Sequence, residues 1–513
     1  MSYGYVIRKN QYYDSVFLMG INKHLSEEDG VTQSAMLMGS EKNKQLLKDI
    51  NVVNDDIKSA QPNDLIVAVV AESQVIVDKA LAKLDFWLTA AIENAPISNL
   101  HTLQQGLAEK PDANLAVISL PGEYAAREAR KAIEAGLNVF IFSDNVSLDD
   151  ELELKKLGRQ KNLLVMGPDC GTGIIGGIGF GFSNSIRRGS IGVIASSGTG
   201  LQEFTCQVHN GGCGISHAIG TGSHDLSELI GGMTTLAALD LLDADPQTKV
   251  IVVLSKPPSP QTIETLVVRF KQSKKPIIAC FLGHQEKLEG EGVAFKHASL
   301  IDEAVKLAVK LAGCEMVIER TNKVDLPKLI SQEKAGFKTD QKYLRGIMAG
   351  GTYTYQTQQV LGSAGIVTYS NAPLDKKYKL ENPDKSRENS IVDMGDDHYT
   401  LGKPHPMIDG TERRRRILLE SHDPQVAVLL VDFILGYGAS MDPVGDLLNS
   451  IIEAKRNVKS RGGFLSVVAN ICGTDGDPQG LNLQRKMLID AGVVVFESNA
   501  NAAQFCAELI KER

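Results

Sequence analysis

The sequence predicts an α/β protein with parallel sheets, and its second half repeats one plan in two tandem units. Short apolar segments alternate with helix-like segments, which is the pattern of βαβ crossovers in a parallel sheet. Two apolar runs, at 191–195 and 344–349, each break at a glycine-rich turn that opens a helical stretch. Each copy later places Asp-Pro-Gln before another apolar run, at 245–247 and 423–425. We therefore expect two related α/β units with paired glycine-rich loops.

Composition and charge narrow the class of protein. The chain has 513 residues, too many for one core, so several domains are expected. Its net charge of −8 argues against a nucleic-acid or anionic-membrane surface, because binding many phosphates requires a basic face. No apolar run approaches the roughly 20 residues that span a bilayer. The N-terminus lacks the blocks of a signal peptide, and the seven cysteines include no Cys-x-x-Cys pair. These features predict a cytoplasmic protein with reduced thiols.

Residues 1–92 are expected to form a small α+β domain. Apolar patterning predicts strands at Tyr5–Lys9, Gln33–Met38 and Leu65–Val70, and helices at Ser15–Leu25, Asn43–Leu47 and Val75–Trp87. The segment offers little chemistry, which favours a role in docking or assembly. The polar stretch 93–112 contains two prolines and is predicted to be a linker.

Residues 112–187 are expected to form a second domain around a parallel sheet. The pattern predicts strands at Leu115–Leu120, Val139–Ser143 and Leu163–Met166, and helices at Ala125–Ala135 and Leu148–Gln160. Ligands of such sheets lie beyond the carboxyl ends of the strands, where Gly167-Pro168-Asp169-Cys170 falls. Cys170 has no histidine near it in the sequence, so we interpret it as a buried structural cysteine.

The repeated units are expected at 188–318 and 340–513. The charged stretch Glu319–Gln341 between them is predicted to be a linker that contains a helix. The second copy carries an insertion, Asn371–Asn389, rich in Lys, Asp, Asn and Pro. We interpret it as an exposed loop, with a lid or a partner-binding segment as the alternative.

The turn Ser197-Gly198-Thr199 follows a strand and precedes a helix. Glycine lets the backbone approach a ligand closely, and the helix start offers free N–H donors to which the two hydroxyls can add. The alternative is plain helix capping by Ser or Thr. The matching turn Gly350-Gly351-Thr352 in the second unit favours anion binding at both.

Further polar loops follow each anion-type turn. The first copy has Gly220–Asp225, where Gly222 could shape an anion loop and His224 could donate or carry a proton; an ordinary turn is the alternative. The second copy has Gly395 followed by Asp396 and Asp397. Adjacent carboxylates repel phosphate, so they would hold Mg²⁺, an amide or an ammonium group, or form an exposed turn.

Two more segments contain candidate side chains. Lys403 and His405 lie among closely spaced prolines, which predicts a non-helical loop that either lines a substrate or connects elements stiffly. Arg413–Arg416 stand at an expected helix start. Consecutive residues fan around a helix, so most of these arginines are expected to be solvated.

From Leu115 onward the chain resembles succinyl-CoA synthetase and other NDP-forming acyl-CoA ligases. The resemblance rests on Gly167-Pro168-Asp169-Cys170, on Ser197-Gly198-Thr199 with Glu203, and on the Gly-rich loops at Gly350-Gly351 and Met394-Gly395. With Tyr13-Asp14-Ser15-Val16 and Met38-Gly39, the whole chain resembles the FdrA family. This resemblance implies a Rossmann-like CoA-binding-type domain followed by two flavodoxin-like ligase-type domains, with the small α+β domain in front.

The departures from the ligases concern their phosphate relay. These enzymes pass phosphate through a histidine in a Gly-His-Ala-Gly-like loop, and here only His284 and His297 are candidates, without the full surroundings. The chain has no ATP-grasp domain, and the early glycine-rich CoA loop is missing. A nucleotide-driven ligase mechanism is therefore not expected of this chain alone.

The resemblance to FdrA implies a subunit of an oxamate carbamoyltransferase-like enzyme of purine and allantoin catabolism, which interconverts oxalurate plus phosphate with oxamate plus carbamoyl phosphate. We expect phosphate or an acyl phosphate as substrate, companion subunits and a homo-oligomer; CoA stays open, and no metal is assigned. The predicted binding residues are Ser197, Gly198, Thr199, Gly222, Gly350, Gly351, Thr352 and Gly395, and the unranked catalytic candidates are His224, Lys403 and His405. The alternatives are an acyl-CoA ligase or CoA-transferase subunit that borrows an ATP-grasp partner, and a non-catalytic scaffold.

Overall fold

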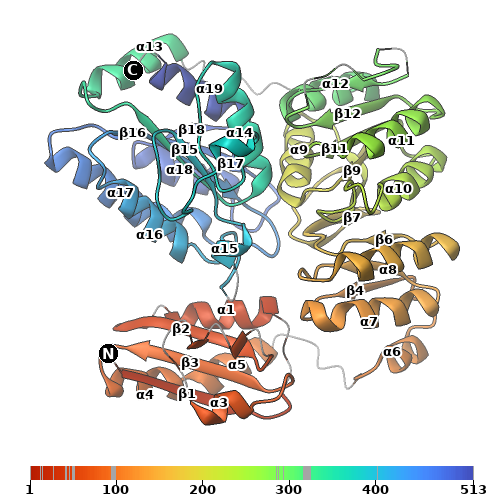
Figure 1. The fold of residues 1–513 in the computed structure, drawn as a ribbon, viewed down its shortest axis with the longest axis horizontal. Helices are drawn as coiled ribbons and strands as arrows, with labels where there is room; N and C mark the ends of the chain where they lie inside the picture. Colours follow the sequence, from red (N-terminus) through yellow and green to blue (C-terminus); the bar gives the residue numbers. More distant parts are fainter. Residues whose placement is uncertain are drawn as a thin grey trace. The chain divides into compact units, whose positions relative to one another are not determined.

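A computed structural model describes the chain except residues 1, 12, 14, 27, 41–42, 45–46, 49–51, 53, 94–99, 285, 287, 293, 316–324, 401–402 and 512–513. It contains two compact units (Figure 1). The N-terminal unit comprises Met1–Ala113, Ser119–Pro121 and Asp397–Asp409. The main unit comprises Asn114–Ile118, Gly122–Asp396 and Gly410–Arg513. Among the described residues, no helix is both long and apolar enough to cross a membrane.

The N-terminal unit contains an antiparallel sheet with the strand order β1-β3-β2. Its helices lie between the strands in the sequence and after the last of them. Its elements are β1 (Ser2–Arg8), α1 (Ser15–Ser26), β2 (Val31–Met38), α3 (Asp55–Ser59), β3 (Leu65–Ala71), α4 (Gln74–Ala82), α5 (Leu84–Glu93) and α6 (Leu103–Glu109). Alternate residues of β3 enter two separate cores: Leu65, Val67 and Val69 pack in one, Ile66 and Ala68 in the other. Both faces of the strand are therefore covered, as its continuous apolar sequence requires.

The structure corrects two details of this region. The single helix predicted at Val75–Trp87 is two helices, because α4 ends at Ala82 and α5 begins at Leu84. The predicted linker 93–112 contains α6, whose start is stabilised by a capping box between Thr102 and Gln105. Part of the predicted helix Asn43–Leu47, and residues 94–99, lie outside the described residues.

The first sheet of the main unit has three parallel strands in the order β4-β5-β6. Its elements are β4 (Leu115–Ile118), α7 (Gly122–Glu134), β5 (Asn138–Ile141), α8 (Leu148–Gln160) and β6 (Val165–Met166). The strand–helix alternation expected here is confirmed, with shorter strands than the apolar runs suggested.

The second sheet has seven strands in the order β13-β12-β11-β9-β10-β7-β8. Its strands are β7 (Thr172–Ile175), β8 (Ile178–Gly181), β9 (Arg188–Ala195), β10 (Ile215–Gly220), β11 (Val250–Ser255), β12 (Ile277–Phe281) and β13 (Lys296–His297). Its helices are α9 (Gly198–Asn210), α10 (Met233–Ala244), α11 (Pro260–Lys271) and α12 (Ile301–Ala312). The hairpin β7–β8 pairs antiparallel to β10, so this sheet extends across the expected domain boundary at residue 187.

The third sheet has five parallel strands in the order β15-β14-β16-β17-β18. Its strands are β14 (Tyr343–Met348), β15 (Ser390–Asp393), β16 (Val426–Ile434), β17 (Ser466–Cys472) and β18 (Val494–Phe496). The helices of this part are α13 (Leu326–Gly336), α14 (Gly351–Ser363), α16 (Thr411–Glu420), α17 (Pro443–Ser460), α18 (Leu481–Asp490) and α19 (Asn499–Ile510), with a short turn η1 (Lys376–Tyr378) in the insertion. The predicted helix between the repeated units is α13.

The chain is thus an α/β protein with several parallel sheets and a small N-terminal domain. The predicted strand–turn–helix repeat is also present, since α9 follows β9 and α14 follows β14 with the same short spacing.

The cysteines divide between a disulfide and buried thiols. Cys213 and Cys314 form a disulfide although they are 101 residues apart, so the expectation that all thiols are reduced is wrong for this pair. Cys170 is buried and burial raises the pKa of its thiol to about 12, which confirms its interpretation as a structural cysteine.

Candidate functional site

The glycine-rich starts of α9 and α14 meet within the main unit, where the two helices pack against each other (Figure 1). The Oγ of Ser197, the N-cap of α9, hydrogen-bonds with Oγ1 of Thr352 in the first turn of α14. A Cβ added to Gly350 would lie 2.6 Å from Cγ2 of Thr199, and one added to Gly200 would lie 3.0 Å from Cγ2 of Thr352. Two loops more than 150 residues apart in sequence therefore form one surface of helix N-termini, which attract anions through their free N–H groups.

Lys256 adds a positive charge at this surface. It follows β11 directly and is exposed, and its Nζ lies 4.8 Å from the ring centroid of Tyr355 in α14. A Cβ on Gly351 would stand 2.9 Å from this Nζ and equally 2.9 Å from Oδ2 of Asp393. Because Gly351 has no side chain, the ammonium group of Lys256 and the carboxylate of Asp393 can both lie close to the backbone at the start of α14.

The sequence analysis missed Lys256. Its position carried a signal, because a polar residue directly after a central strand of a parallel sheet lies at the edge where ligands bind. Lys256 lies in no glycine-rich motif and is followed by two prolines, so the motifs in the sequence did not point to it.

Asp393 is the acidic member of the site and ends β15. Its Oδ1 accepts a hydrogen bond of 2.9 Å from the amide of Gly395. Asn371 fixes its backbone, accepting from the Asp393 amide and donating to the Asp393 carbonyl, both at 2.9 Å. Burial raises the pKa of Asp393 to about 6, against the opposing charge of Lys256. The first residue of the insertion 371–389 thus positions a site carboxylate.

A buried ion pair holds the backbone of Ala349, just before the turn at Gly350-Gly351. Asp432 of β16 accepts hydrogen bonds from the amide of Ala349 at 2.9 Å and from Nη2 of Arg413 at 3.0 Å. The prediction that the arginines of 413–416 are mostly solvated is wrong for two of them. Arg413 and Arg416 are 4% and 2% exposed, and Arg416 pairs with Glu420 at 2.6 Å. Residues three apart share a helix face, and this face of α16 is covered by the chain.

The loop after β10 is held by charges from α8. Lys155 is buried and lies 2.8 Å from both Glu151 and Asp225. Nδ1 of His224 lies 3.5 Å from Glu151, whose carboxylate raises the pKa of this half-exposed imidazole. Gly222 has φ +86°, and a Cβ there would stand 2.2 Å from the carbonyl oxygen of Pro168. This position thus requires glycine for packing.

Asp169 connects this loop to the rest of the site. Asp169 is an exposed residue, yet the desolvation of its carboxyl group by the surrounding chain raises the pKa of this group, while its hydrogen bond with Ser223 and the charges of His224 and Lys256 oppose this rise. Asp169 after β6, His224 after β10 and Lys256 after β11 thus lie close enough for their charges to interact, although β6 belongs to a different sheet.

Lys403, His405 and Asp397 belong to the N-terminal unit, whereas the loops described above belong to the main unit. The contacts described for Lys403 and His405 are local: the Lys403 amide donates to the Thr400 carbonyl at 3.0 Å, and the Met407 amide donates to Nδ1 of His405 at 3.2 Å. Their catalytic roles stay predictions. Among the described residues, no three His, Cys, Asp or Glu side chains are arranged to hold a metal ion.

His284 and His297 lie edge to face, with ring centroids 6.1 Å apart. The Nε2 atoms of both are buried and have no hydrogen-bond partner in the described part of the chain. Burial lowers the pKa of His297, which keeps this imidazole neutral.

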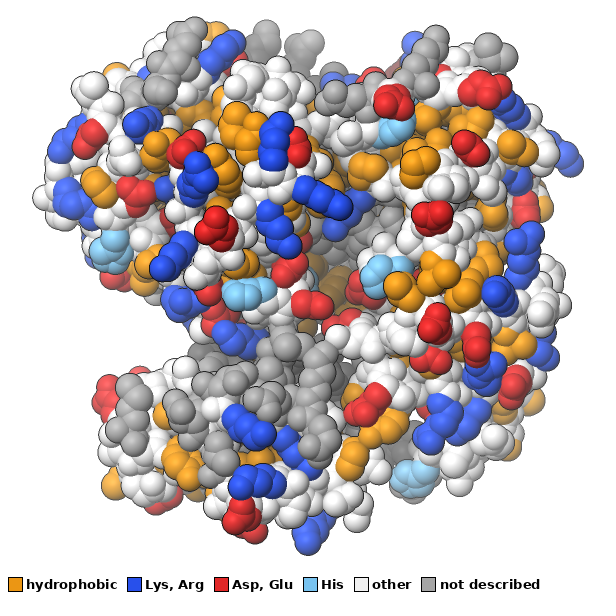
Figure 2. Space-filling model, in the orientation of Figure 1, with side chains coloured by type: hydrophobic (Ala, Val, Ile, Leu, Met, Phe, Trp, Pro, Cys, Tyr) orange, Lys and Arg blue, Asp and Glu red, His pale blue; other side chains and the backbone are white. Residues whose placement is uncertain are grey.

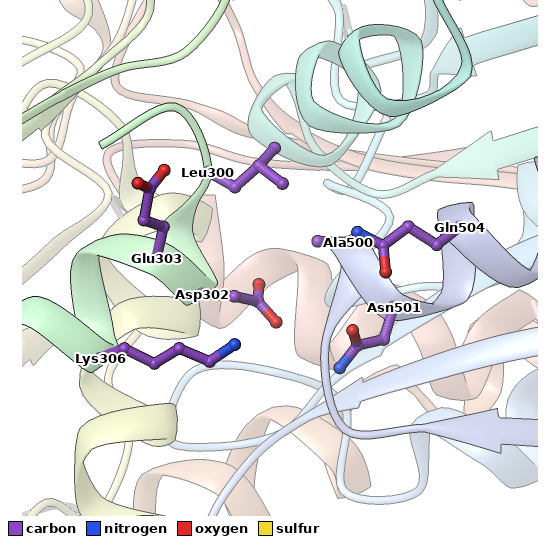
Figure 3. A pocket seen from close by; sticks show the side chains of 7 residues that line it. All are labelled: Leu300, Asp302, Glu303, Lys306, Ala500, Asn501 and Gln504. Atoms are coloured by element: carbon purple, nitrogen blue, oxygen red, sulfur yellow. The ribbon is translucent and has the colours of Figure 1, made fainter. Parts of the chain in front are cut away.

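A separate cavity of about 190 Å³ lies between α12 and α19. Figure 3 shows Asp302 and Lys306 of α12 extending toward Asn501 and Gln504 of α19. None of the predicted site residues lines this cavity. On the face shown in Figure 2, Lys and Arg side chains alternate with Asp and Glu, without an extended basic patch.

Comparison with protein families yields two matches. Residues 1–102 match the AllF, heavy metal-associated domain, and residues 347–509 match the CoA-ligase family. Soft heavy metals are bound mainly by cysteine thiolates, with methionine as a further ligand. The first cysteine of this chain is Cys170, and Met36 and Met38 of the N-terminal unit are buried in its core. The residues of this domain therefore do not fit a thiolate metal site.

Among proteins of similar sequence, the uncharacterized protein YahF of Escherichia coli (strain K12) is 40% identical over 512 residues, covering 99% of both chains. The ADP-forming sulfoacetate-CoA ligase subunit SauD of Bilophila wadsworthia is 24% identical, over 44% of this chain and 76% of that protein. The succinate–CoA ligase [ADP-forming] subunit alpha of Aquifex aeolicus is 26% identical, over 37% of this chain and 63% of that protein. The latter two relatives are subunits of multi-subunit CoA ligases.

Proposed function

Because the chain belongs to the family of YahF, an FdrA-like branch of the CoA-ligase proteins with an AllF-type N-terminal domain, we propose that it is the phosphate-binding subunit of an oxamate carbamoyltransferase-like enzyme. The reaction converts oxalurate and phosphate to oxamate and carbamoyl phosphate. The AllF-type domain supports the link to allantoin catabolism, and companion subunits complete the enzyme.

The observation that carries the proposal is the meeting of the starts of α9 and α14 beside Lys256. A small dianion bound at this junction would meet the first N–H groups of α14 and the ammonium group of Lys256, and the hydroxyls of Ser197 and Thr352 lie at the same junction. Donors that are already in place stabilise negative charge without reorganisation. Such a set of donors suits phosphate or the phosphate end of an acyl phosphate.

The chemistry needs positioning more than a covalent relay. A phosphate oxygen attacks the ureido carbonyl carbon of oxalurate, and the negative charge that develops on the carbonyl oxygen is stabilised by N–H donors and Lys256. The C–N bond to the oxamate nitrogen then breaks, and this nitrogen takes up a proton. His224 is the candidate donor because Glu151 keeps its imidazole protonated to higher pH.

Replacing Lys256 tests the proposal. We expect Lys256→Ala to weaken binding of inorganic phosphate by at least about tenfold, since a charge-assisted hydrogen bond is worth roughly 1.5–3 kcal/mol. Isothermal titration calorimetry on the full chain measures the effect. Lys249, exposed and immediately before β11, provides the matched control: Lys249→Ala removes the same charge at the opposite end of the strand. Equal affinity in all three proteins contradicts the proposal.

A CoA-ligase subunit is the second candidate, favoured by the family match of residues 347–509 and by the unpartnered nitrogens of His284 and His297. This candidate predicts transfer of the γ-phosphate of ATP to one of these histidines when an ATP-grasp subunit is supplied. Incubation with γ-labelled ATP and such a subunit, followed by acid-labile phosphate analysis, distinguishes the two. We expect no label, and label lost in His284→Asn or His297→Asn would establish the ligase instead.

A further inference from the structure

We propose that the cavity between α12 and α19 binds a small α-amino acid with an uncharged side chain, holding its ammonium group at Asp302 and its carboxylate at Lys306. This site is separate from the phosphate site proposed above and shares none of its residues. The cavity volume of about 190 Å³ lies below the roughly 300–1,000 Å³ of pockets for drug-sized ligands. It therefore suits a molecule of only a few heavy atoms.

Four polar side chains from two helices face one another across the cavity. Asp302 and Lys306 come from α12, and Asn501 and Gln504 come from α19 (Figure 3). The four together carry one negative charge, one positive charge and two neutral amides. A ligand with both an ammonium group and a carboxylate matches this set, because each of its charged ends meets an opposite charge.

Asp302 and Lys306 are both available to a ligand. Oppositely charged residues four apart on a helix commonly pair, yet in the described part of the chain the ammonium group of Lys306 has neither an ion pair nor a hydrogen bond. The carboxylate of Asp302 accepts one long hydrogen bond, 3.4 Å from Nε2 of Gln207. Glu303 also lines the cavity, but its Oε2 accepts from the amide of Ser299 at 2.8 Å. Asp302 is therefore the acidic group left to receive a cation.

The remaining walls suit the rest of an amino acid. Asn501 and Gln504 share a face of α19, and within the described residues their side-chain amides make no hydrogen bond. Each amide offers a donor and an acceptor to the ends of the ligand. Leu300 and Ala500 add an apolar wall, which belongs to a small apolar cluster with Val360 of α14. An apolar side chain of the ligand can pack there, whereas a charged one would lose hydration without gaining a partner.

The contacts of Asp302 determine which variants test the site. Nε2 of Gln207, which donates to Asp302, also donates to Oε1 of the buried Glu203 at 2.9 Å, so replacing Asp302 reaches beyond the cavity. Lys306→Gln is the cleaner change, because it removes a charge at an exposed position and nearly preserves the length of the side chain. Lys310→Gln is the matched control: it removes the same charge from an exposed position one turn further along α12, away from the residues that line the cavity.

Three probes separate the two ends of the ligand. They are L-alanine, propionate, which lacks the ammonium group, and ethylamine, which lacks the carboxylate. Titration of the full chain followed by saturation-transfer NMR measures the affinity for each. We expect the wild-type chain to bind L-alanine at least about tenfold more tightly than either fragment, since each fragment loses one charge-assisted contact. Because phosphate does not enter this experiment, its result is independent of the proposed function.

The variants should give a crossed pattern. Lys306→Gln is expected to lower the affinity for L-alanine at least about tenfold and to bind ethylamine no more weakly, whereas Lys310→Gln matches the wild type. Asp302→Asn should lose L-alanine to a similar extent and keep its affinity for propionate, a distinction that general unfolding does not produce. The inference is overturned if L-alanine does not bind, if the wild-type chain binds all three probes equally, or if Lys306→Gln and Lys310→Gln have the same effect.

Discussion

Gly351 shows how a missing side chain lets charged groups approach the start of a helix. Lys256 and Asp393 approach the position of its absent Cβ equally closely, and the helix that begins at this residue contributes N–H donors. Gly362 lies on the same helix, and a Cβ there meets nothing within 4 Å. The two glycines therefore differ in how closely other side chains approach them, although both are helical.

Alanine at each position separates the two roles. We expect Gly351→Ala to weaken phosphate binding strongly, because its methyl group would displace the ammonium group of Lys256 from the start of α14. We expect Gly362→Ala to leave binding unchanged and to raise the free energy of unfolding by roughly 0.5–1 kcal/mol, the ordinary gain of alanine in a helix. Calorimetric titration with phosphate and urea unfolding measure the two effects. Intact phosphate binding in Gly351→Ala would place the anion elsewhere.

At the scale of elements, Glu203 joins three helices of the main unit. It lies in α9 and is completely buried; its Oε2 accepts from the hydroxyl of Tyr353 in α14 at 2.8 Å, and its Oε1 accepts from the amide of Asn499 in α19 at 3.1 Å. Burial raises the pKa of Glu203 to about 7, and the charge of Asp302 in α12 contributes to the rise. The packing of the helices therefore favours the protonated form of Glu203.

This raised pKa predicts how stability depends on pH. Between the ordinary pKa near 4.5 and about 7, the folded chain holds a proton that the unfolded chain releases, so the free energy of unfolding falls as the pH rises through this window. The decrease from Glu203 is on the order of 3 kcal/mol. In Glu203→Gln this decrease should be absent, which urea unfolding of both proteins at pH 5, 6, 7 and 8 measures. Parallel curves for the two proteins would contradict the prediction.

The face of α16 that carries Arg413 allows a second prediction at this scale. Removing one partner of a buried ion pair leaves the other charge uncompensated, at a cost of roughly 3–5 kcal/mol. Arg413→Ala should therefore destabilise the main unit by about this amount, because Asp432 stays buried behind Ala349. Arg415→Ala, on the exposed face of the same helix, should change stability by less than about 1 kcal/mol. Similar values for both variants in urea unfolding would show that the buried pair is not important for stability.

For the whole molecule, the question is whether one chain is sufficient for activity. The main unit holds the candidate phosphate site, and the family relationship supports companion subunits. We expect phosphate-dependent consumption of oxalurate only when the neighbouring gene products are added, with the chain alone binding phosphate but not turning over. A colorimetric assay for carbamoyl phosphate measures this. If Thr199→Ala and Gly351→Ala leave the assembled complex fully active, the chain is a scaffold.

Much of the fold could be predicted from the sequence. Apolar periodicity located most strands, and the repeated glycine turns identified the starts of α9 and α14, because helix starts and buried strands depend on residues close together in the chain. The break between α4 and α5 was not predicted, and helix α6 was missed although its capping box, Thr102 and Gln105, is a local sequence signal. The antiparallel hairpin β7–β8 was missed because its place in the sheet depends on pairing with the distant strand β10.

The sequence by itself determined that this chain is an α/β protein of tandem units with two glycine-rich turns at helix starts, because these features depend on residues close together in the chain. Tertiary structure decided which side chains complete the site: Lys256, Asp393 and the buried pair of Arg413 and Asp432 come from four separate elements. It also decided that Cys213 pairs with Cys314. These contacts join residues far apart in the chain, and only the packing of the sheets and helices brings such residues together.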